Sequence, residues 1–239
     1  MFAECTEFED AAYECLDLVP HPGDTHVGIA LVLDCSGSVA SQMDEINRAA
    51  ASIVAEISDD PRASRGVDLM VVSVGSASHA EVVQPFAPIA QVKPPVLSAG
   101  GCTPLNEGIM LAEQGIRDYN HRLAREGVPY RTPWLVVVSD GYATDDELQS
   151  RMITQVSDAV NRGSGGHLAL WFVGTDGFDE AYARQLPTPR VVHLKDHQYR
   201  VFADWLIENA RIQSQTKVGE KAAVAPLPPG MEIPEAWRV

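Results

Sequence analysis

The sequence lacks the features that mark several large classes of protein. It has only four cysteines in 239 residues and no CxxC pair, so we expect reduced thiols rather than a disulfide framework or a zinc knuckle. Its longest apolar runs, at 27–33 and 134–138, are far shorter than the roughly 20 residues that span a bilayer. These absences exclude a disulfide-rich scaffold and a membrane-spanning chain.

Basic residues are also scarce. The chain has 18 Lys and Arg against 33 Asp and Glu, a formal net charge of -15, and it contains no basic run. Such a balance argues against binding a nucleic acid or an anionic membrane surface. The first ten residues are acidic and lack the positive segment and apolar run of a secretion signal, so we expect a cytoplasmic location.

Short apolar runs alternate with amphipathic stretches along most of the chain. Strands are expected at 27–33, 67–74, 79–86, 134–138, 167–173 and 191–194. Helices are expected from a Ser41 cap to Asp60, at 104–125, 145–161, 178–185 and 199–213. The first strand is apolar throughout, which indicates burial on both faces. The alternation predicts a doubly wound α/β domain with a mostly parallel sheet and helices on both faces, a Rossmann-like arrangement.

This pattern bounds one domain. We expect the folded domain at 23–215, an N-terminal extension at 1–22 without clear periodicity, and a proline-rich tail at 216–239. The tail is interpreted as a poorly ordered terminus. The alternative is a docking segment whose Met231, Ile233 and Trp237 bind a partner. Pro85 and Pro88 favour an edge position for the strand that contains them.

Three polar loops are expected at the carboxyl ends of strands, where parallel sheets bind their ligands. The first is Asp34-Cys35-Ser36-Gly37-Ser38, directly after the first strand. The second contains Thr103 before the long helix, and the third contains Asp140 after the fourth strand. Hydroxyl and carboxylate oxygens suit a hard ion that takes about six oxygen ligands. Without His or Cys in the set, Mg²⁺ or Mn²⁺ is favoured over zinc, copper or calcium.

Asp34, Ser36, Ser38, Thr103 and Asp140, in this order and spacing, resemble the metal-ion-dependent adhesion site of von Willebrand factor A-type (VWA) domains. The similarity covers most of residues 27–210, and the stretches 98–103 and 139–146 resemble the bacterial TerY-like branch, which is associated with tellurite resistance and stress response. The resemblance implies that Ser36, Ser38 and sometimes Thr103 ligate the ion directly. It implies that Asp34 and Asp140 often act through water.

The resemblance also implies a function without turnover. An ion with few directly bound charges favours an acidic residue of another protein at its open position, so the metal bridges two chains. We therefore expect a protein-binding module in a bacterial stress-response or signalling complex, with a protein kinase and a metal-dependent phosphatase as candidate partners. Cys35 stands where Thr or Ala is commoner in the family, and the N-terminal extension has no known family role.

Other interpretations remain open at this point. The Asp34–Ser38 loop alone is equally consistent with a polar turn that caps a helix. A metal-dependent hydrolase or phosphotransferase is the alternative function, although no phosphate loop, nucleophile elbow or HExxH motif occurs. A scaffold that uses only the proline-rich tail is the third.

Several reactive residues receive structural roles. Cys35 and Cys102 are expected to pack as thiols, with a redox-sensitive disulfide as the less favoured alternative. His167 and His193 are expected to be hydrogen-bonded structural residues. Asp145, Asp146 and Glu147 are interpreted as a cap at the positive end of their own helix rather than as an extension of the acidic site.

Overall fold

The computed structural model describes residues 25–161, 168–216 and 220–238. Within them one sheet has the strand order β3-β2-β1-β4-β5-β6-β7. The strands are β1 (Val27–Asp34), β2 (Val67–Val74), β3 (Ala80–Pro88), β4 (Trp134–Ser139), β5 (Ala169–Gly174), β6 (Arg190–Leu194) and β7 (Met231–Glu232). The five central strands, β2, β1, β4, β5 and β6, are parallel to one another. The edge strand β3 is antiparallel to β2, and the other edge strand, β7, is antiparallel to β6.

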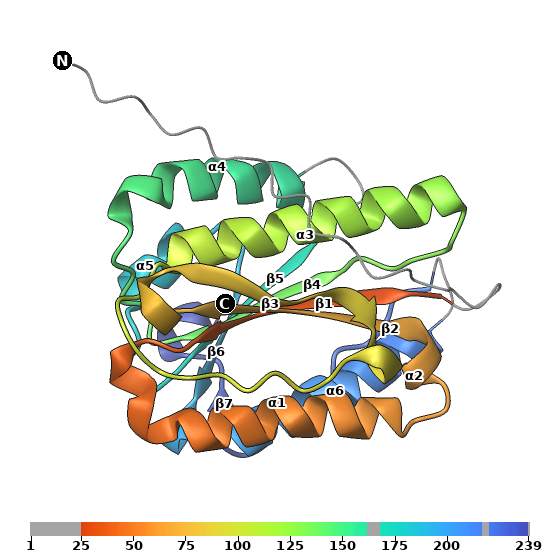
Figure 1. Ribbon diagram of the computed structural model, residues 1–239, viewed down its shortest axis with the longest axis horizontal. Helices are drawn as coiled ribbons and strands as arrows, with labels where there is room; N and C mark the ends of the chain where they lie inside the picture. The colour runs from red at the N-terminus through yellow and green to blue at the C-terminus, as the bar shows by residue number, and fades with distance from the viewer. Residues whose placement is uncertain (1–24, 162–167, 217–219, 239) are drawn as a thin grey trace.

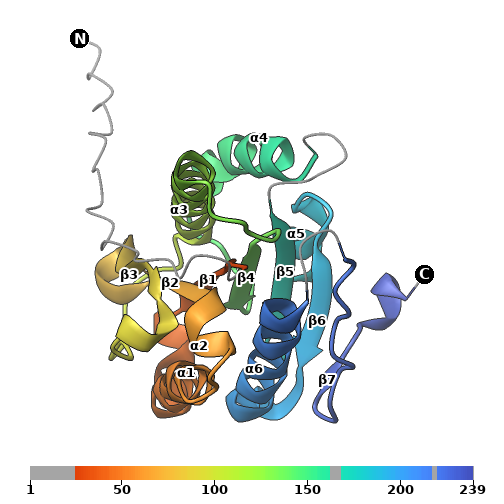
Figure 2. The ribbon, with the colours of Figure 1, turned by 90° about the vertical axis from the view of Figure 1, so that its right-hand side faces the viewer.

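Helices cover both faces of the sheet. The helices are α1 (Met43–Ser58), α2 (Ala63–Gly66), α3 (Leu105–Glu126), α4 (Asp146–Asn161), α5 (Glu180–Gln185) and α6 (Tyr199–Gln215). Figure 1 shows α3 and α4 on one face and α1 and α6 on the other, and the turned view in Figure 2 shows the same three layers. The predicted doubly wound α/β fold is confirmed.

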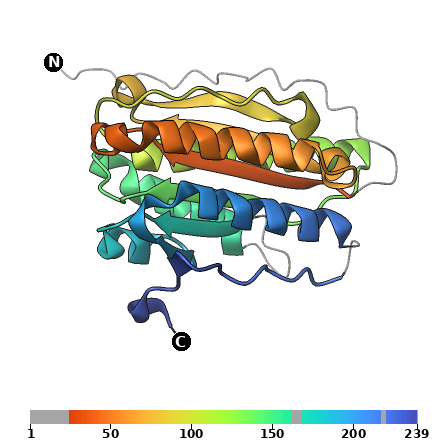
Figure 3. The same cartoon turned by 90° about the horizontal axis from the view of Figure 1, so that it is seen from below.

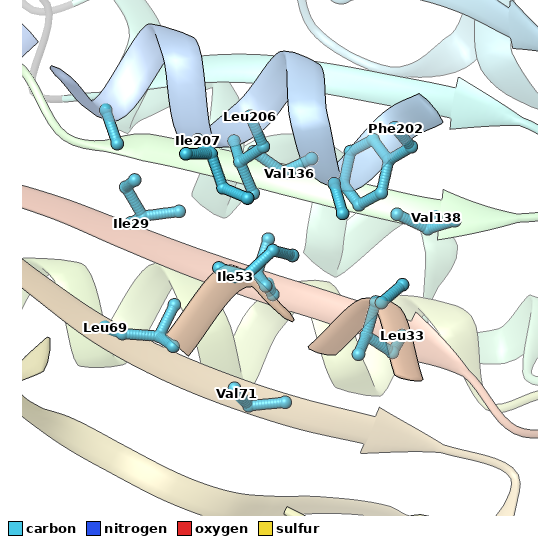
Figure 4. Close-up of a cluster of buried hydrophobic side chains, with 14 of the residues drawn as sticks. Ile29, Leu33, Ile53, Leu69, Val71, Val136, Val138, Phe202, Leu206 and Ile207 are labelled. Carbon is cyan, nitrogen blue, oxygen red and sulfur yellow. The ribbon is translucent and has the colours of Figure 1, made fainter. Parts of the chain in front are cut away.

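Two hydrophobic clusters, one on each face, hold these layers together. Alternate residues of β1 belong to different clusters: Ile29, Leu31 and Leu33 face α1 and α6, whereas Ala30 and Val32 face α3. Figure 4 shows Ile29 and Leu33 among side chains from α1, α6 and the neighbouring strands. The prediction that β1 is buried on both faces is confirmed, because every residue of the strand is buried.

Local details differ from the sequence-based expectations. The predicted Ser41 cap is wrong, because Ser41 lies inside a 3-10 helix, Gly37–Gln42, that leads directly into α1. The long helix ends as predicted at Gly127, whose left-handed φ of 68° suits glycine. The strand with Pro85 and Pro88 lies at the edge of the sheet, as expected.

The tail is the largest correction. Its residues 220–238 pack against the domain: Ala225 and Met231 are buried in the cluster beneath the sheet, and Met231 pairs with Leu194 of β6. The backbone N–H of Ala225 donates to Asn209 and its carbonyl accepts from the Trp205 indole, both on α6. Figure 3 shows this segment running beside α6. The expected poorly ordered tail is therefore wrong for these residues, whereas the extension at 1–22 lies outside the described residues.

None of the helices in the described ranges is both long and apolar enough to cross a membrane.

Candidate metal centre

The candidate site lies where the sheet changes its direction of winding. In the sheet, β2 and β3 lie on one side of β1, and β4, β5 and β6 lie on its other side. The order therefore reverses between β1 and β4, which are neighbours at the switch point. Both strands end at the same edge, β1 at Asp34 and β4 at Ser139. Ligands of open α/β sheets bind at such crevices.

Asp34 is held by hydrogen bonds at both of its carboxylate oxygens. Oδ1 accepts from the backbone N–H of Ser36 at 2.9 Å, and Oδ2 accepts from the Ser139 hydroxyl at 2.6 Å. The residue is 3% exposed, and this burial raises the pKa of Asp34 above its usual value, while the hydrogen bonds from Ser139 and Ser36 lower it. Both carboxylate oxygens accept hydrogen bonds from the protein, so Asp34 helps to hold the Asp34–Ser38 loop in place.

Ser36, Ser38 and Asp140 form a row of oxygen atoms that begins next to Asp34. The Ser36 and Ser38 hydroxyl oxygens are 2.9 Å apart, and the Ser38 hydroxyl donates to Oδ2 of Asp140 at 3.0 Å. Ser36 is buried, Ser38 is exposed and Asp140 is half-buried, so the row is open to solvent at its middle member, Ser38. We call this set the oxygen row.

Thr103 is brought to the same place by the backbone of its loop. Gly100 N–H donates to the Cys35 carbonyl at 2.8 Å, and Gly37 N–H donates to the Gly101 carbonyl at 3.3 Å. Thr103 also makes two hydrogen bonds with Thr144. The Thr103 N–H donates to Oγ1 of Thr144, and the Thr144 N–H donates to the Thr103 carbonyl. Thr103 is 6% exposed and sits between the two loops that contain the oxygen row. The three predicted loops therefore converge.

A glycine makes this convergence possible. Gly75 follows β2 with a φ of +112°, and a Cβ added there would lie 2.6 Å from the Ser36 nitrogen and 2.9 Å from the Cys102 carbonyl oxygen. Such distances are far below van der Waals contact, so only glycine fits beneath both loops.

Asp145 stabilises this edge of the sheet in an unexpected way. It is buried, and its carboxylate accepts from the backbone N–H groups of Asn106 and Glu107 and from the Asn106 amide. We expected Asp145 to cap α4, the helix that follows it. This expectation is wrong, because the Asp145 carboxylate caps the N-terminus of α3 instead. It thereby ties the Asp140 loop to the helix that Thr103 precedes.

The spacing of the oxygen row fits a small hard cation. At Mg–O distances near 2.0–2.1 Å, adjacent ligands of an octahedron are about 2.9 Å apart. The two separations in the row, 2.9 and 3.0 Å, are those of its hydrogen bonds, and they are compatible with that edge. No group of three His, Cys, Asp or Glu side chains suited to a metal occurs within the described residues, so a centre here depends on the serine hydroxyls. Hard oxygen donors of this kind suit Mg²⁺ or Mn²⁺.

The expectation that both cysteines pack as thiols holds for one of them. Cys35 is buried, whereas Cys102 is exposed, so the expected packing is wrong for Cys102; both are free thiols. Burial raises the pKa of the Cys35 thiol to about 12, which keeps it protonated. His193 lies 2.9 Å from Asp176, and its role as a hydrogen-bonded residue is confirmed. His167 lies outside the described residues.

Two residues near the site were missed from sequence. Ser139 positions Asp34 and also accepts from the Gly141 N–H. Tyr199 shares a small cavity with Asp34 and donates to Gln42. Burial raises the pKa of Tyr199, and the charges of Asp34 and Asp140 add to that shift. Ser139 directly precedes Asp140 in the sequence, and this position could have indicated a role at the site. No neighbouring residue in the sequence indicates such a role for Tyr199.

Neither protein-family models nor curated protein sequences match the chain. Solved structures do. The von Willebrand factor domain of the type V pili tip protein Mfa5 from Porphyromonas gingivalis has a TM-score of 0.54 at 11% identity, covering 81% of this chain and 98% of that one. This chain therefore has the fold of a VWA domain. Within that class, the TerY-like branch stays a prediction.

Two further structures are similar at lower scores. Proximal thread matrix protein 1 from the mussel byssus has a TM-score of 0.49 at 13% identity, covering 79% of this chain and 48% of that one. The ArnB paralog VWA2 from Sulfolobus acidocaldarius has a TM-score of 0.48 at 15% identity, covering 77% and 45%. The chain spans about half the length of these two proteins.

Proposed function

We propose that this chain is a metal-dependent protein-binding module that holds Mg²⁺, or Mn²⁺, at the oxygen row and recruits an acidic residue of a partner protein to it. The observation that carries the proposal is the row itself: the Ser36, Ser38 and Asp140 oxygens lie at separations compatible with octahedral ligands, and the row is open to solvent at Ser38. Ser36 and Ser38 would ligate the ion directly. Thr103 and Asp140 would complete its protein shell, and Asp34 would position the loop.

The charge balance supports an acidic partner group. Two of the ligands directly in the row are neutral hydroxyls, and the Asp34 oxygens are already engaged by Ser36 and Ser139. A divalent ion bound there keeps positive charge toward its open position, where a carboxylate is the matching ligand.

The setting is also a proposal. The similarity of the 98–103 and 139–146 stretches to the TerY-like branch supports a bacterial, cytoplasmic stress-response complex, with a protein kinase and a metal-dependent phosphatase as partners. Mfa5, which has the same fold, is a pili tip protein. A hydrolase or phosphotransferase has less support, because Ser36 stands where an aspartyl-phosphate type of site would want a second carboxylate.

The first experiment measures the ion directly. Isothermal titration of the full chain with Mg²⁺ should give saturable binding, and Mg²⁺ should raise the melting temperature because it binds the folded state. Ser36→Ala and Asp140→Asn should remove both effects. Asp158→Asn, an exposed carboxylate on α4, is the matched control and should retain both. Equal Mg²⁺ binding in all four proteins would contradict the proposed site.

The second experiment measures recognition. A displayed peptide library is bound to the immobilised chain in Mg²⁺ and eluted with EDTA. Recovered peptides should be enriched in Asp or Glu, and Ser36→Ala should recover none above background. Recovery that is insensitive to EDTA would reject the metal bridge.

A further inference from the structure

Tyr142 is an exposed aromatic ring beside the oxygen row. It is 58% exposed, and it is the one aromatic among the exposed large apolar side chains of the described residues. Its backbone N–H donates to Oδ1 of Asp140 at 3.2 Å, and its hydroxyl donates to the Gly177 carbonyl at 3.2 Å. The residue is therefore held at its backbone N–H and at its hydroxyl, while its ring is open to solvent.

These anchors make the ring span two acidic loops. One end lies at Asp140, a member of the oxygen row, and the other lies at Gly177, the neighbour of Asp176. Asp176 is 38% exposed, and Asp146 is exposed at the start of α4. A rigid, exposed aromatic side chain is the kind of residue that contributes strongly to interfaces, because little entropy is lost when it is covered.

The surrounding charge decides what the ring would cover. This edge of the sheet carries seven aspartates, of which Asp34 and Asp145 are buried, and one lysine: Asp34, Asp140, Asp145, Asp146, Asp176, Asp179, Asp196 and Lys195. Lys195 is paired with Glu232 at 2.8 Å. His193 and His197 face Asp176 from the β6 side, at 2.9 and 3.9 Å. An apolar partner residue over Tyr142 would cover the more accessible carboxylates at its two ends, Asp140 and Asp176, whereas a cation would be attracted by them and by the ring face.

We propose that the partner segment carries a Lys or Arg close to its metal-bridging acid, and that this basic side chain binds over Tyr142 with Asp176 beside it. The inference rests on the proposed function and extends it to the chemistry of the partner. The acid supplies the ligand that the metal lacks, and the base matches the acidic face around it. A segment with an acid alone meets repulsion from that face.

The same displayed library tests the inference. Among peptides eluted by EDTA, Lys or Arg should be enriched within a few positions of the Asp or Glu. One such peptide and its version with Gln in place of the base are then compared by fluorescence polarisation in Mg²⁺. The wild-type chain should prefer the basic version by about tenfold, and this preference should shrink as salt is raised.

Variants of the ring decide the assignment. Tyr142→Ala should reduce the preference by about threefold or more, whereas Tyr142→Phe, which keeps the ring and loses the bond to Gly177, should retain most of it. Asp176→Asn should also reduce it. Enrichment in acids without neighbouring bases, or an equal preference in Tyr142→Ala, would overturn the inference and leave the metal bridge standing. Absence of any peptide that depends on Mg²⁺ would overturn the proposed function and this inference with it.

Discussion

The hydroxyl of Ser139 donates a 2.6 Å hydrogen bond to Oδ2 of Asp34, so the last residue of β4 holds the last residue of β1. Both residues are buried. This bond joins the two strands at the switch point of the sheet and fixes the carboxylate from which the Ser36–Ser38 loop starts.

Ser139→Ala should therefore destabilise the domain. It leaves a buried carboxylate oxygen without its donor and the Gly141 N–H without its acceptor, which should lower the free energy of unfolding by about 1–3 kcal/mol. Urea denaturation followed by circular dichroism measures the change. Ser150→Ala, at an exposed position on α4, should stay within about 0.5 kcal/mol of wild type. A loss no larger than that of the control would show that the bond contributes little.

Gly75→Ala should disrupt the loops of the candidate site. The added Cβ would clash with the Ser36 backbone and the Cys102 carbonyl, and the positive φ would be strained as well. We expect a loss of about 3 kcal/mol or more in unfolding free energy, because backbone atoms on both sides must move. Gly127→Ala is the control, since its φ is +68° and nothing lies within 4 Å of the added Cβ, and it should lose about 1 kcal/mol. Equal losses would mean that strain alone matters at Gly75.

Met231→Ala should loosen the tail. Met231 is 5% exposed in the cluster beneath the sheet, so its truncation should cost about 2 kcal/mol. Ile233→Ala, two residues further along and 44% exposed, should cost little. Hydrogen exchange at the Ala225 N–H, which bonds to Asn209, reports whether the segment has detached. A tail that docks only on a partner, as the alternative interpretation held, would make both substitutions neutral in the isolated chain.

Cys102 should react with iodoacetamide far faster than Cys35 in the native protein. The thiolate is the reactive species, and burial raises the pKa of Cys35 to about 12, so at about pH 8 it is almost entirely thiol. Cys102 is exposed. Peptide mass spectrometry after brief labelling separates the two sites, and unfolding in urea should abolish the difference. Similar native rates would contradict the buried environment of Cys35.

The sequence was most informative where one physical signal dominates. The run 27–33 is apolar without interruption, which fits a strand covered on both faces, and Gly127 marks the end of α3 through its left-handed conformation. The convergence of the Asp34, Thr103 and Asp140 loops followed from topology, because parallel strands place their carboxyl ends at one edge.

Tertiary contacts explain what the sequence did not reveal. Asp145 directly precedes one helix, yet its carboxylate caps α3, which local reading of the chain does not indicate. Ser139 acquires its role only when β4 lies beside β1. The tail resembles a disordered terminus in composition, but Ala225 and Met231 find an apolar surface and hydrogen-bond partners far along the chain.

The segment that follows α6 crosses from one face of the sheet to the other. Met231 is buried in the cluster beside α6, and Trp237 packs against the cluster on the opposite face. Between them, β7 pairs with the end of β6. Exposed edge strands are templates for aggregation, and the opposite edge is formed by β3 with Pro85 and Pro88. The segment that follows α6 thus covers the β6 edge and prevents edge-to-edge association. Variants that release it should precipitate at concentrations at which the intact chain stays in solution.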